Sequence, residues 1–226
     1  MGKNGGRKSM WGVFYWVCST FVKYLIITTV VDILLMGRLH IRYSRRCAQR
    51  HFMMEGQNRI DFQTKYECSA FASAYLLRHH GREADGNVLY KKMPQKTKEG
   101  YVYPKGIVQM LSCYGIRVKY CAGNFKALKR EICKGAPVIV MLRTRVGERY
   151  LHFVPVVGYD EENVYLAESI KEFANCGEGE EVYNRKVGNA EFMKLWNTSM
   201  LKMPFYRNTY FEGGSRQEQG GELVVR

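Results

Sequence analysis

A long apolar stretch near the N-terminus stands apart from the rest of the chain. Between Trp11 and Met36 most residues are aromatic or aliphatic, and only Lys23 and Asp32 are charged. A helix of this length would measure about 39 Å, which is enough to cross a bilayer at a tilt. We therefore expect residues 11–36 to form a transmembrane anchor, preceded by a basic N-terminus at residues 1–10.

Two other interpretations of residues 11–36 stay open. A charge near the bilayer centre costs about 2.5 to 3.5 kcal/mol, so Lys23 and Asp32 weigh against a spanning helix and leave a helix on the membrane surface as one alternative. A removed signal peptide is the other, although no small-x-small cleavage site follows Met36.

The remainder of the chain changes from helical to strand periodicity. Apolar residues first recur at helical spacing, and glycines such as Gly81 and Gly115 follow the expected helix ends. The spacing predicts helices at residues 68–79, 104–114 and 124–134, the last with Asn124 as its N-cap. Apolar, β-branched runs between turn residues then predict strands at residues 137–142, 151–159 and 163–167, followed by a short helix at residues 190–196.

Helices followed by an antiparallel sheet indicate the α+β class. Residues 56–212 are numerous enough for one globular domain. We expect a basic juxtamembrane linker, residues 37–55, between the apolar stretch and this domain. Residues 213–226 contain Gly-Gly twice and few apolar side chains, which predicts a disordered tail.

The positive charge of the protein is concentrated around the apolar stretch. The chain has a formal net charge of +14, and residues 1–50 contribute +8 of it through nine lysines and arginines against the single acid Asp32. Basic residues that flank an apolar span favour contact with anionic lipid headgroups. No motif for RNA or DNA binding accompanies them, so we expect membrane lipid as a partner and no nucleic acid.

The same basic residues favour one orientation. Three of them precede the span and five follow it between residues 38 and 50. Because the cytoplasmic flank of a span carries the excess of Lys and Arg, this count predicts a single-pass protein whose C-terminal domain is cytoplasmic.

Seven cysteines are distributed along the chain without a C-x-x-C pair. An odd number with this spacing argues against a disulfide framework and against a structural zinc site. We expect free thiols in a reducing compartment, no metal and no other cofactor.

Cys68 has the surroundings of a nucleophile. It opens the helix expected at residues 68–79, where unpaired backbone N–H groups and the helix dipole favour a reactive thiolate. Gln63 stands five residues upstream, and a side-chain amide there can help the Cys68 backbone N–H to hold an oxyanion. An inert core cysteine is the alternative, since free cysteines are commonly buried.

A general base has to come from elsewhere in the sequence. Of the five histidines, His152 alone stands at the head of an expected core strand, residues 151–159. A lone histidine beside apolar residues is most often structural, but a candidate nucleophile in the same chain makes His152 the candidate base.

Together these residues resemble cysteine peptidase family 39, the double-glycine leader peptidases, and more closely the stand-alone relatives of that family in the papain-like superfamily. The family order is a Gln, a Cys that opens a helix, a Gly that ends it, a His in a strand ending in Gly-Tyr-Asp, and an acid after the next strand. The matching residues are Gln63, Cys68, Gly81, His152, Gly158-Tyr159-Asp160 and Glu168. The resemblance covers about residues 58–200 and implies a papain-like fold, with N-terminal helices packed on an antiparallel sheet.

By this resemblance Glu168 is the third catalytic residue. The chain departs from the family at two places, with Cys68-Ser69 where Cys-Gly is common and Glu168-Ser169 where Asp-Pro is common. A glutamate can orient an imidazole as an aspartate does, but its extra methylene needs a deeper seat. An ordinary strand-end acid is the other interpretation of Glu168, and Asp160 and Asn163 are further candidates for the third position.

The resemblance implies a thiol protease, a hydrolase that cleaves peptide bonds in a peptide or protein substrate. Cys68 would attack the carbonyl, His152 would transfer protons, and Gln63 would hold the oxyanion. A peptide- or leader-binding module with little turnover and an acyltransferase or transpeptidase on the same scaffold are the alternatives. Nothing in the sequence indicates an oligomeric state.

Overall fold

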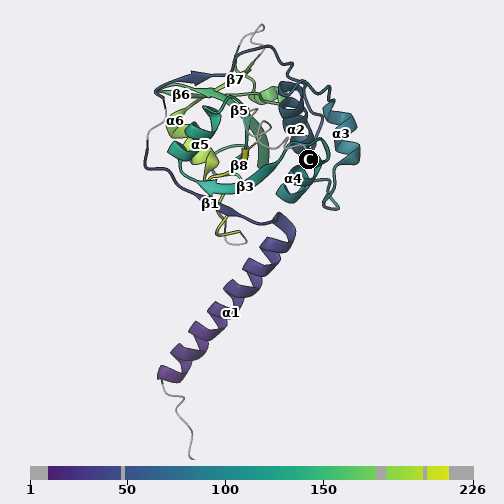
Figure 1. Cartoon of the computed structure of the whole chain (residues 1–226). Coiled ribbons are helices and arrows are strands. Elements are labelled where there is room, and N and C mark those ends of the chain that lie inside the picture. Colours follow the sequence, from purple (N-terminus) through teal and green to yellow (C-terminus); the bar gives the residue numbers. More distant parts are fainter. Residues whose placement is uncertain (1–9, 47–48, 177–181, 201–202, 214–226) are drawn as a thin grey trace, which may run out of the picture.

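The computed structural model describes residues 10–46, 49–176, 182–200 and 203–213 (Figure 1). The basic N-terminus expected at residues 1–10 therefore lies outside the described residues, except for Met10 at the start of the first helix. The tail expected at residues 213–226 also lies outside them, except for Gly213, which ends the last strand.

Helix α1 (Met10–Met36) projects away from the rest of the chain (Figure 1). Large apolar side chains are exposed all around it, and Trp11, for example, is 77% exposed. A core helix of a soluble protein would have such side chains covered. Within the described residues, α1 is the one helix long and apolar enough to cross a membrane, and little of its apolar span is buried.

The end of α1 lies against the globular part of the chain. Asp32 and Met36, four residues apart and so on one face of the helix, are both buried. Asp32 therefore faces the protein rather than the surroundings of the helix. Lys23 is exposed on the middle of the helix.

Three helices follow in the globular part: α2 (Cys68–His79), α3 (Gly86–Lys92) and α4 (Pro104–Cys113). The predictions for α2 and α4 are confirmed to within a residue. Gly81 and Gly115 lie just beyond these helices with φ of 71° and 77°, a left-handed conformation that suits glycine. Helix α3 was not predicted, because seven residues are too few for a clear period. Its start is capped by Asp85, which accepts a 2.9 Å hydrogen bond from the Val88 N–H.

Eight strands of the described residues form one sheet in the order β1-β3-β8-β4-β5-β6-β7, with β2 beside β5. The pairs are antiparallel except β1 with β3, which is parallel and was not predicted. Strands β4, β5 and β6 confirm the predicted strands. The strand bounds are β1 His40–Arg42, β2 Phe52–Met53, β3 Val118–Gly123, β4 Val138–Arg143, β5 Leu151–Tyr159, β6 Asn163–Leu166, β7 Arg185–Gly188 and β8 Thr209–Gly213.

Helices cover both faces of this sheet, and because all its strand pairs but one are antiparallel, the fold is α+β as predicted. Along β4, Ile139 and Met141 pack with α2 and α4, whereas Val138, Val140 and Leu142 pack on the side of α5 (Phe125–Ile132) and α6 (Asn189–Trp196). A strand buried on both faces has no polar face, which explains its continuous apolar run in the sequence. Figure 1 shows α2, α3 and α4 grouped on one side of the sheet.

The segment expected as a juxtamembrane linker, residues 37–55, joins the sheet. Its strand β1 pairs with β3 and its strand β2 pairs with β5. Each strand has only two or three residues, so neither had a readable period. Because β1 begins four residues after α1 ends, the apolar helix is connected to the sheet by a short path.

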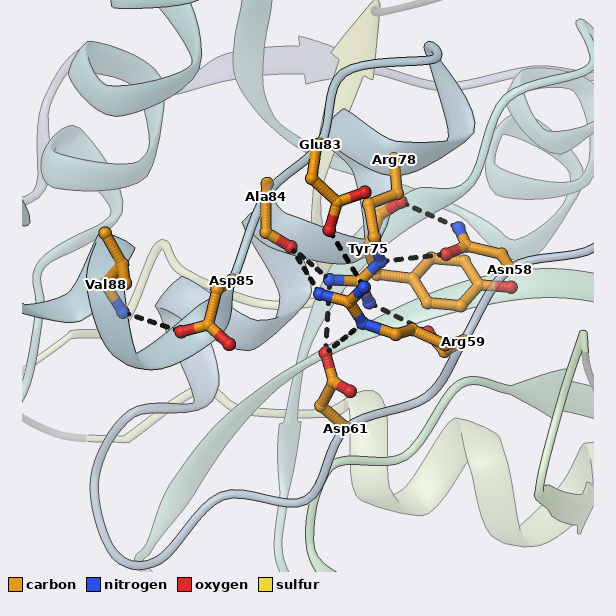
Figure 2. Close-up of polar contacts among 9 residues, drawn as sticks. All are labelled: Asn58, Arg59, Asp61, Tyr75, Arg78, Glu83, Ala84, Asp85 and Val88. Atoms are coloured by element: carbon orange, nitrogen blue, oxygen red, sulfur yellow. Dashed lines mark hydrogen bonds and ion pairs between the residues drawn. The ribbon is translucent and has the colours of Figure 1, made fainter.

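A buried arginine network joins helix α2 to the segment that precedes it (Figure 2). Arg78, near the end of α2, donates to Asn58 Oδ1 at 3.1 Å, to the Arg59 carbonyl at 2.8 Å and to the Ala84 carbonyl at 2.7 Å, and it pairs with Asp61 at 3.2 Å. Asn58 in turn donates to the Tyr75 carbonyl of α2 at 2.9 Å. These contacts hold residues 58–61 against α2. They therefore fix the position from which the chain continues to Gln63.

We expect Arg78→Met to lower the free energy of unfolding by about 2 kcal/mol, because the Asn58 amide oxygen and the Arg59 carbonyl lose their donor, while Asp61 and the Ala84 carbonyl keep only Arg59. Urea denaturation of the full chain in detergent measures this. Arg59 is a matched control, since its side chain is 48% exposed against 9% for Arg78. Arg59→Met should cost under about 1 kcal/mol; an equal loss in both variants would contradict the role given to Arg78.

Candidate active site

Cys68 is the first residue of α2 and is buried. The residue before it, Glu67, makes no side-chain cap to the helix, and the first turn contains no acid. The Glu67 carboxylate instead accepts a 2.6 Å hydrogen bond from the Lys65 N–H. Cys68 therefore lies at the positive, N-terminal end of the helix dipole.

His152 is the second residue of β5 and is buried beside Cys68. Cys68 is one of the groups that raise the pKa of His152, so its sulfur lies near the ring. The Nε2 atom of His152 lies 2.7 Å from Glu168 Oε1, so Nδ1 is the ring nitrogen that remains for the sulfur. The structure thus brings together the three residues that the sequence indicated as nucleophile, base and third residue.

Glu168 follows β6 and is fully buried, so its charge depends on hydrogen-bond donors. Oε1 also accepts from the Ile170 N–H at 2.8 Å, and Oε2 accepts from Arg185 Nη1 of β7 at 2.8 Å. The Asn184 side chain holds the Glu168 backbone, accepting from its N–H at 2.7 Å and donating to its carbonyl at 2.9 Å. These contacts fix the position of the Glu168 carboxylate, which lies one methylene further from the backbone than that of an aspartate.

The positive charge on His152 and the negative charge on Glu168 stabilise each other. Burial by itself lowers the pKa of His152, but the Glu168 charge and the hydrogen bonds to Cys68 and Glu168 outweigh burial and raise it to about 10. Burial likewise raises the pKa of Glu168, and the His152 charge, the Ile170 N–H and Arg185 together lower it to about 2. Imidazolium and carboxylate therefore coexist over the whole neutral range.

The effect of this pair on stability follows from these directions. The pKa of His152 is higher in the folded protein than its ordinary 6.5, so its contribution is complete below pH 6.5 and is lost as the pH rises through about 10. The pKa of Glu168 is lower than its ordinary 4.5, so its contribution is present above pH 4.5 and is lost as the pH falls through about 2.

Gln63 lies in the segment that precedes α2, and its side-chain amide has one defined orientation. Nε2 donates to the Lys65 carbonyl at 2.6 Å, and a carbonyl can only accept, so this nitrogen cannot be exchanged with the oxygen. Oε1 accepts from Ser169 Oγ at 2.9 Å, and the Gln63 N–H donates to the Ser169 carbonyl at 2.8 Å. One amide hydrogen of Gln63 remains for a further acceptor.

Asp160 and Asn163 were the other candidates for the third position, and the structure does not bring them to His152. Asp160 directly follows β5 and Asn163 begins β6, whereas His152 is at the beginning of β5. Asp160 accepts from the Asn163 N–H at 2.6 Å and from the Tyr165 hydroxyl at 2.6 Å. Both residues therefore stabilise the turn.

Three polar residues of this site were not found from the sequence: Ser169, Asn184 and Arg185. Ser169 appeared only as a departure from the family pattern. Asn184 and Arg185 are polar residues in a segment without a clear period, and only the pairing of β6 with β7 brings Arg185 beside Glu168.

The described residues include no group of three His, Cys, Asp or Glu side chains that could hold a metal ion. The cysteines in the described ranges are free thiols; Cys47 lies outside these ranges.

Comparison with known proteins gives one family match. The model of the Peptidase_C39 like family matches residues 49–199, a range that includes Gln63, Cys68, His152 and Glu168. No curated protein matched the chain.

Solved structures similar to this chain are peptidase domains. The peptidase domain of Streptococcus ComA, a bi-functional ABC transporter involved in a quorum-sensing pathway, has 13% identity and a TM-score of 0.50, and covers 69% of this chain and 96% of its own. A putative C39-like peptidase from Bacillus anthracis has 14% identity and a TM-score of 0.49, with 70% and 96% covered. A double glycine motif protease from the AMS/PCAT transporter, solved with its leader peptide, has 16% identity and a TM-score of 0.46, with 73% and 97% covered. At such identities the ComA likeness shows the papain-like fold.

We expect the His152 ring to keep its imidazolium NMR signature up to about pH 10. In Glu168→Gln the strongest partner that raises this pKa is lost while burial remains, so the ring should become neutral at least two pH units lower. Histidine-selective 13C labelling, with the signal assigned by its loss in His152→Ala, measures both. Glu161→Gln is the control, since Glu161 is an exposed acid paired with Arg50. A titration unchanged in Glu168→Gln would contradict the ion pair.

Proposed function

Because the chain belongs to the Peptidase_C39 like family, we propose that it is a membrane-anchored cysteine peptidase with Cys68 as nucleophile, His152 as acid and base, and Glu168 as the third residue. The observation that carries the proposal is the buried 2.7 Å contact between His152 and Glu168, with Cys68 beside the His152 ring at the N-terminus of α2. The substrate is a peptide or protein, in keeping with the leader peptide bound by the AMS/PCAT protease.

The reaction begins with Cys68 as thiolate and His152 as imidazolium. The sulfur attacks the carbonyl carbon, a C–S bond forms, and the carbonyl π electrons move to oxygen. The Cys68 backbone N–H and the remaining amide hydrogen of Gln63 donate to this oxyanion. When the oxyanion collapses, the C–N bond breaks, and His152 gives its proton to the departing amine.

Water completes the cycle. Neutral His152 takes a proton from a water molecule as the oxygen attacks the acyl carbon, and a second oxyanion forms in the same place. Its collapse breaks the C–S bond, releases the carboxylic acid and restores the thiolate and imidazolium. The overall reaction is hydrolysis of one peptide bond, and no cofactor takes part.

Glu168 acts through His152. Its Oε1 atom fixes the ring so that Nδ1 faces the sulfur, and its charge stabilises the imidazolium that the first step requires. Arg185 and the Ile170 N–H hold the carboxylate in place. The replacement of the family's Asp by Glu is therefore compatible with a working triad.

Helix α1 serves as the membrane anchor in this proposal. Its apolar side chains are exposed, and exposed apolar surface of this extent is stable in lipid rather than in water. The buried positions of Asp32 and Met36 favour a retained anchor over a removed signal peptide. The excess of basic residues after the helix favours a cytoplasmic domain.

We expect a thiol-reactive peptide probe to label Cys68 in the wild-type protein, as measured by mass spectrometry of the modified peptides. Labelling at residue 68 must disappear in Cys68→Ala and should fall at least tenfold in His152→Ala, because the thiolate loses its imidazolium partner. Cys113 is an exposed thiol that should react equally in all three proteins. Equal reactivity of Cys68 and Cys113 would show that Cys68 is an ordinary thiol.

We expect Gln63→Ala to lower kcat by about 100- to 1000-fold, the usual loss when one oxyanion donor is removed, with little change in KM. Ser169→Ala should lower kcat less, because it frees the Gln63 amide to rotate without removing it, and Ser169→Thr should restore most of the rate. Peptide hydrolysis followed by product mass spectrometry measures these rates.

The same assay separates the alternative functions. If an added amine captures the acyl group in place of water, the enzyme is a transpeptidase. Binding of peptides without turnover would refute the peptidase function.

A further inference from the structure

A cavity of about 320 Å³ opens beside Cys68. Of the described residues that line it, five are aromatic and three are methionines, and Arg149 is the one charged side chain. Tyr66 and Tyr150 stand at its exposed rim, whereas Met141 and Phe153 form its buried wall. Because it adjoins the nucleophile, a side chain that flanks the scissile bond can enter it.

The lining of this cavity selects for a large apolar side chain. A glycine in that position would leave the cavity unfilled, and an acidic or basic side chain would be removed from water without an opposite charge in the buried wall. Aromatic rings provide a broad apolar contact, and methionines adapt their shape to the side chain that enters. A leucine-, methionine- or phenylalanine-sized residue satisfies all of these conditions.

The cavity also adjoins the end of the membrane helix, because its lining includes Met36, the last residue of α1. Residues 11–30 of the helix cover about 30 Å, the thickness of the hydrocarbon layer. The remaining six residues add about 9 Å, which takes Met36 through a headgroup layer of about 5 to 8 Å to its outer edge. The cavity therefore lies at the height of the headgroup layer when α1 spans the bilayer.

A second group of residues supports this height. Phe205, which is exposed, and Arg38 line a hollow with Asp32 and Ile33 of α1. An exposed aromatic ring and an arginine around the end of an apolar span are typical anchors at the membrane–water interface. They hold this face of the domain toward the bilayer.

We propose that the substrate is a membrane-inserted polypeptide, cut within a few residues of the point where it leaves the bilayer, with a large apolar side chain in the cavity beside Cys68. The proposal rests on the proposed peptidase function of Cys68. It adds that α1 sets the distance from the bilayer at which the active site cleaves its substrate. A substrate segment that has just left the lipid meets the cavity directly, whereas a segment far from the membrane has to fold back toward it.

The test uses the full chain in vesicles of phosphatidylcholine and phosphatidylglycerol. A soluble peptide library, analysed by mass spectrometry, first identifies the residues that flank the cleaved bond. The preferred sequence is then placed about 5, 15 or 40 residues after the span of a membrane-inserted carrier. Five extended residues reach only about 17 Å. We expect enrichment of large apolar residues in the library, and cleavage of the 5-residue carrier at least as fast as that of the 40-residue carrier.

Matched variants link the specificity to the cavity. Tyr150 at the rim is 65% exposed, and Tyr43, outside the cavity, is 71% exposed, so replacing either should not unfold the protein. Tyr150→Ala should lower kcat/KM at least fivefold for the preferred large side chain relative to alanine at the same position. Tyr43→Ala should leave that ratio unchanged, and Cys68→Ala should give no product.

The outcomes separate this inference from the peptidase function itself. Cleavage of soluble peptides with a preference for glycine, or cleavage of the 40-residue carrier but not the 5-residue carrier, would overturn the inference and leave a peptidase. Absence of product from every substrate, together with an unreactive Cys68, would overturn both.

Discussion

The buried contact between His152 and Glu168 is the interaction on which the candidate site depends. A carboxylate and an imidazolium are each unstable in an apolar interior unless an opposite charge and hydrogen-bond donors surround them. Here the carboxylate has His152, the Ile170 N–H and Arg185 on its two oxygens. Those donors come from β5, from the turn after β6 and from β7, so the pairing of three neighbouring strands is what makes the charged pair stable.

The turn at Glu168 and Ser169 supports two parts of the proposed chemistry at once. Glu168 orients His152, and the next residue, Ser169, holds the backbone and the amide oxygen of Gln63. The arginine network around Arg78 adds a second connection, since it attaches the segment before Gln63 to the helix that begins with Cys68. The proposed nucleophile, oxyanion donor and base thus belong to one frame of connected contacts, and such a frame keeps catalytic groups in a reactive geometry.

The apolar helix α1 is attached to this frame and lies in a defined position relative to it. Asp32 and Met36, near the end of α1, are buried against the globular part, and Met36 lines the cavity beside Cys68. The chain then continues almost at once into β1, which pairs with β3 in the sheet. A flexible tether would allow the site to move freely relative to α1, whereas this short connection limits such movement.

The sequence by itself determined the elements whose pattern is local. The apolar span, α2 and α4 with their glycines, and strands β4 to β6 each have a period or a run of residues that needs no knowledge of the rest of the fold. The order of Gln63, Cys68, His152 and Glu168 was also visible, because it resembles the order of the family pattern. The short strands β1, β2 and β7 had no such pattern, and β3 and β8 were likewise missed.

Only the tertiary structure decided which residues meet. Arg185, Asn184 and Ser169 carry no local signal of a role, and they acquire one because strand pairing and the turn after β6 bring them to Glu168 and Gln63. Asp160 and Asn163 were further candidates for the third position, and the direction of β5 separates them from His152. Hydrogen bonds and charge interactions act over a few ångströms in space, and distance along the sequence does not report that separation.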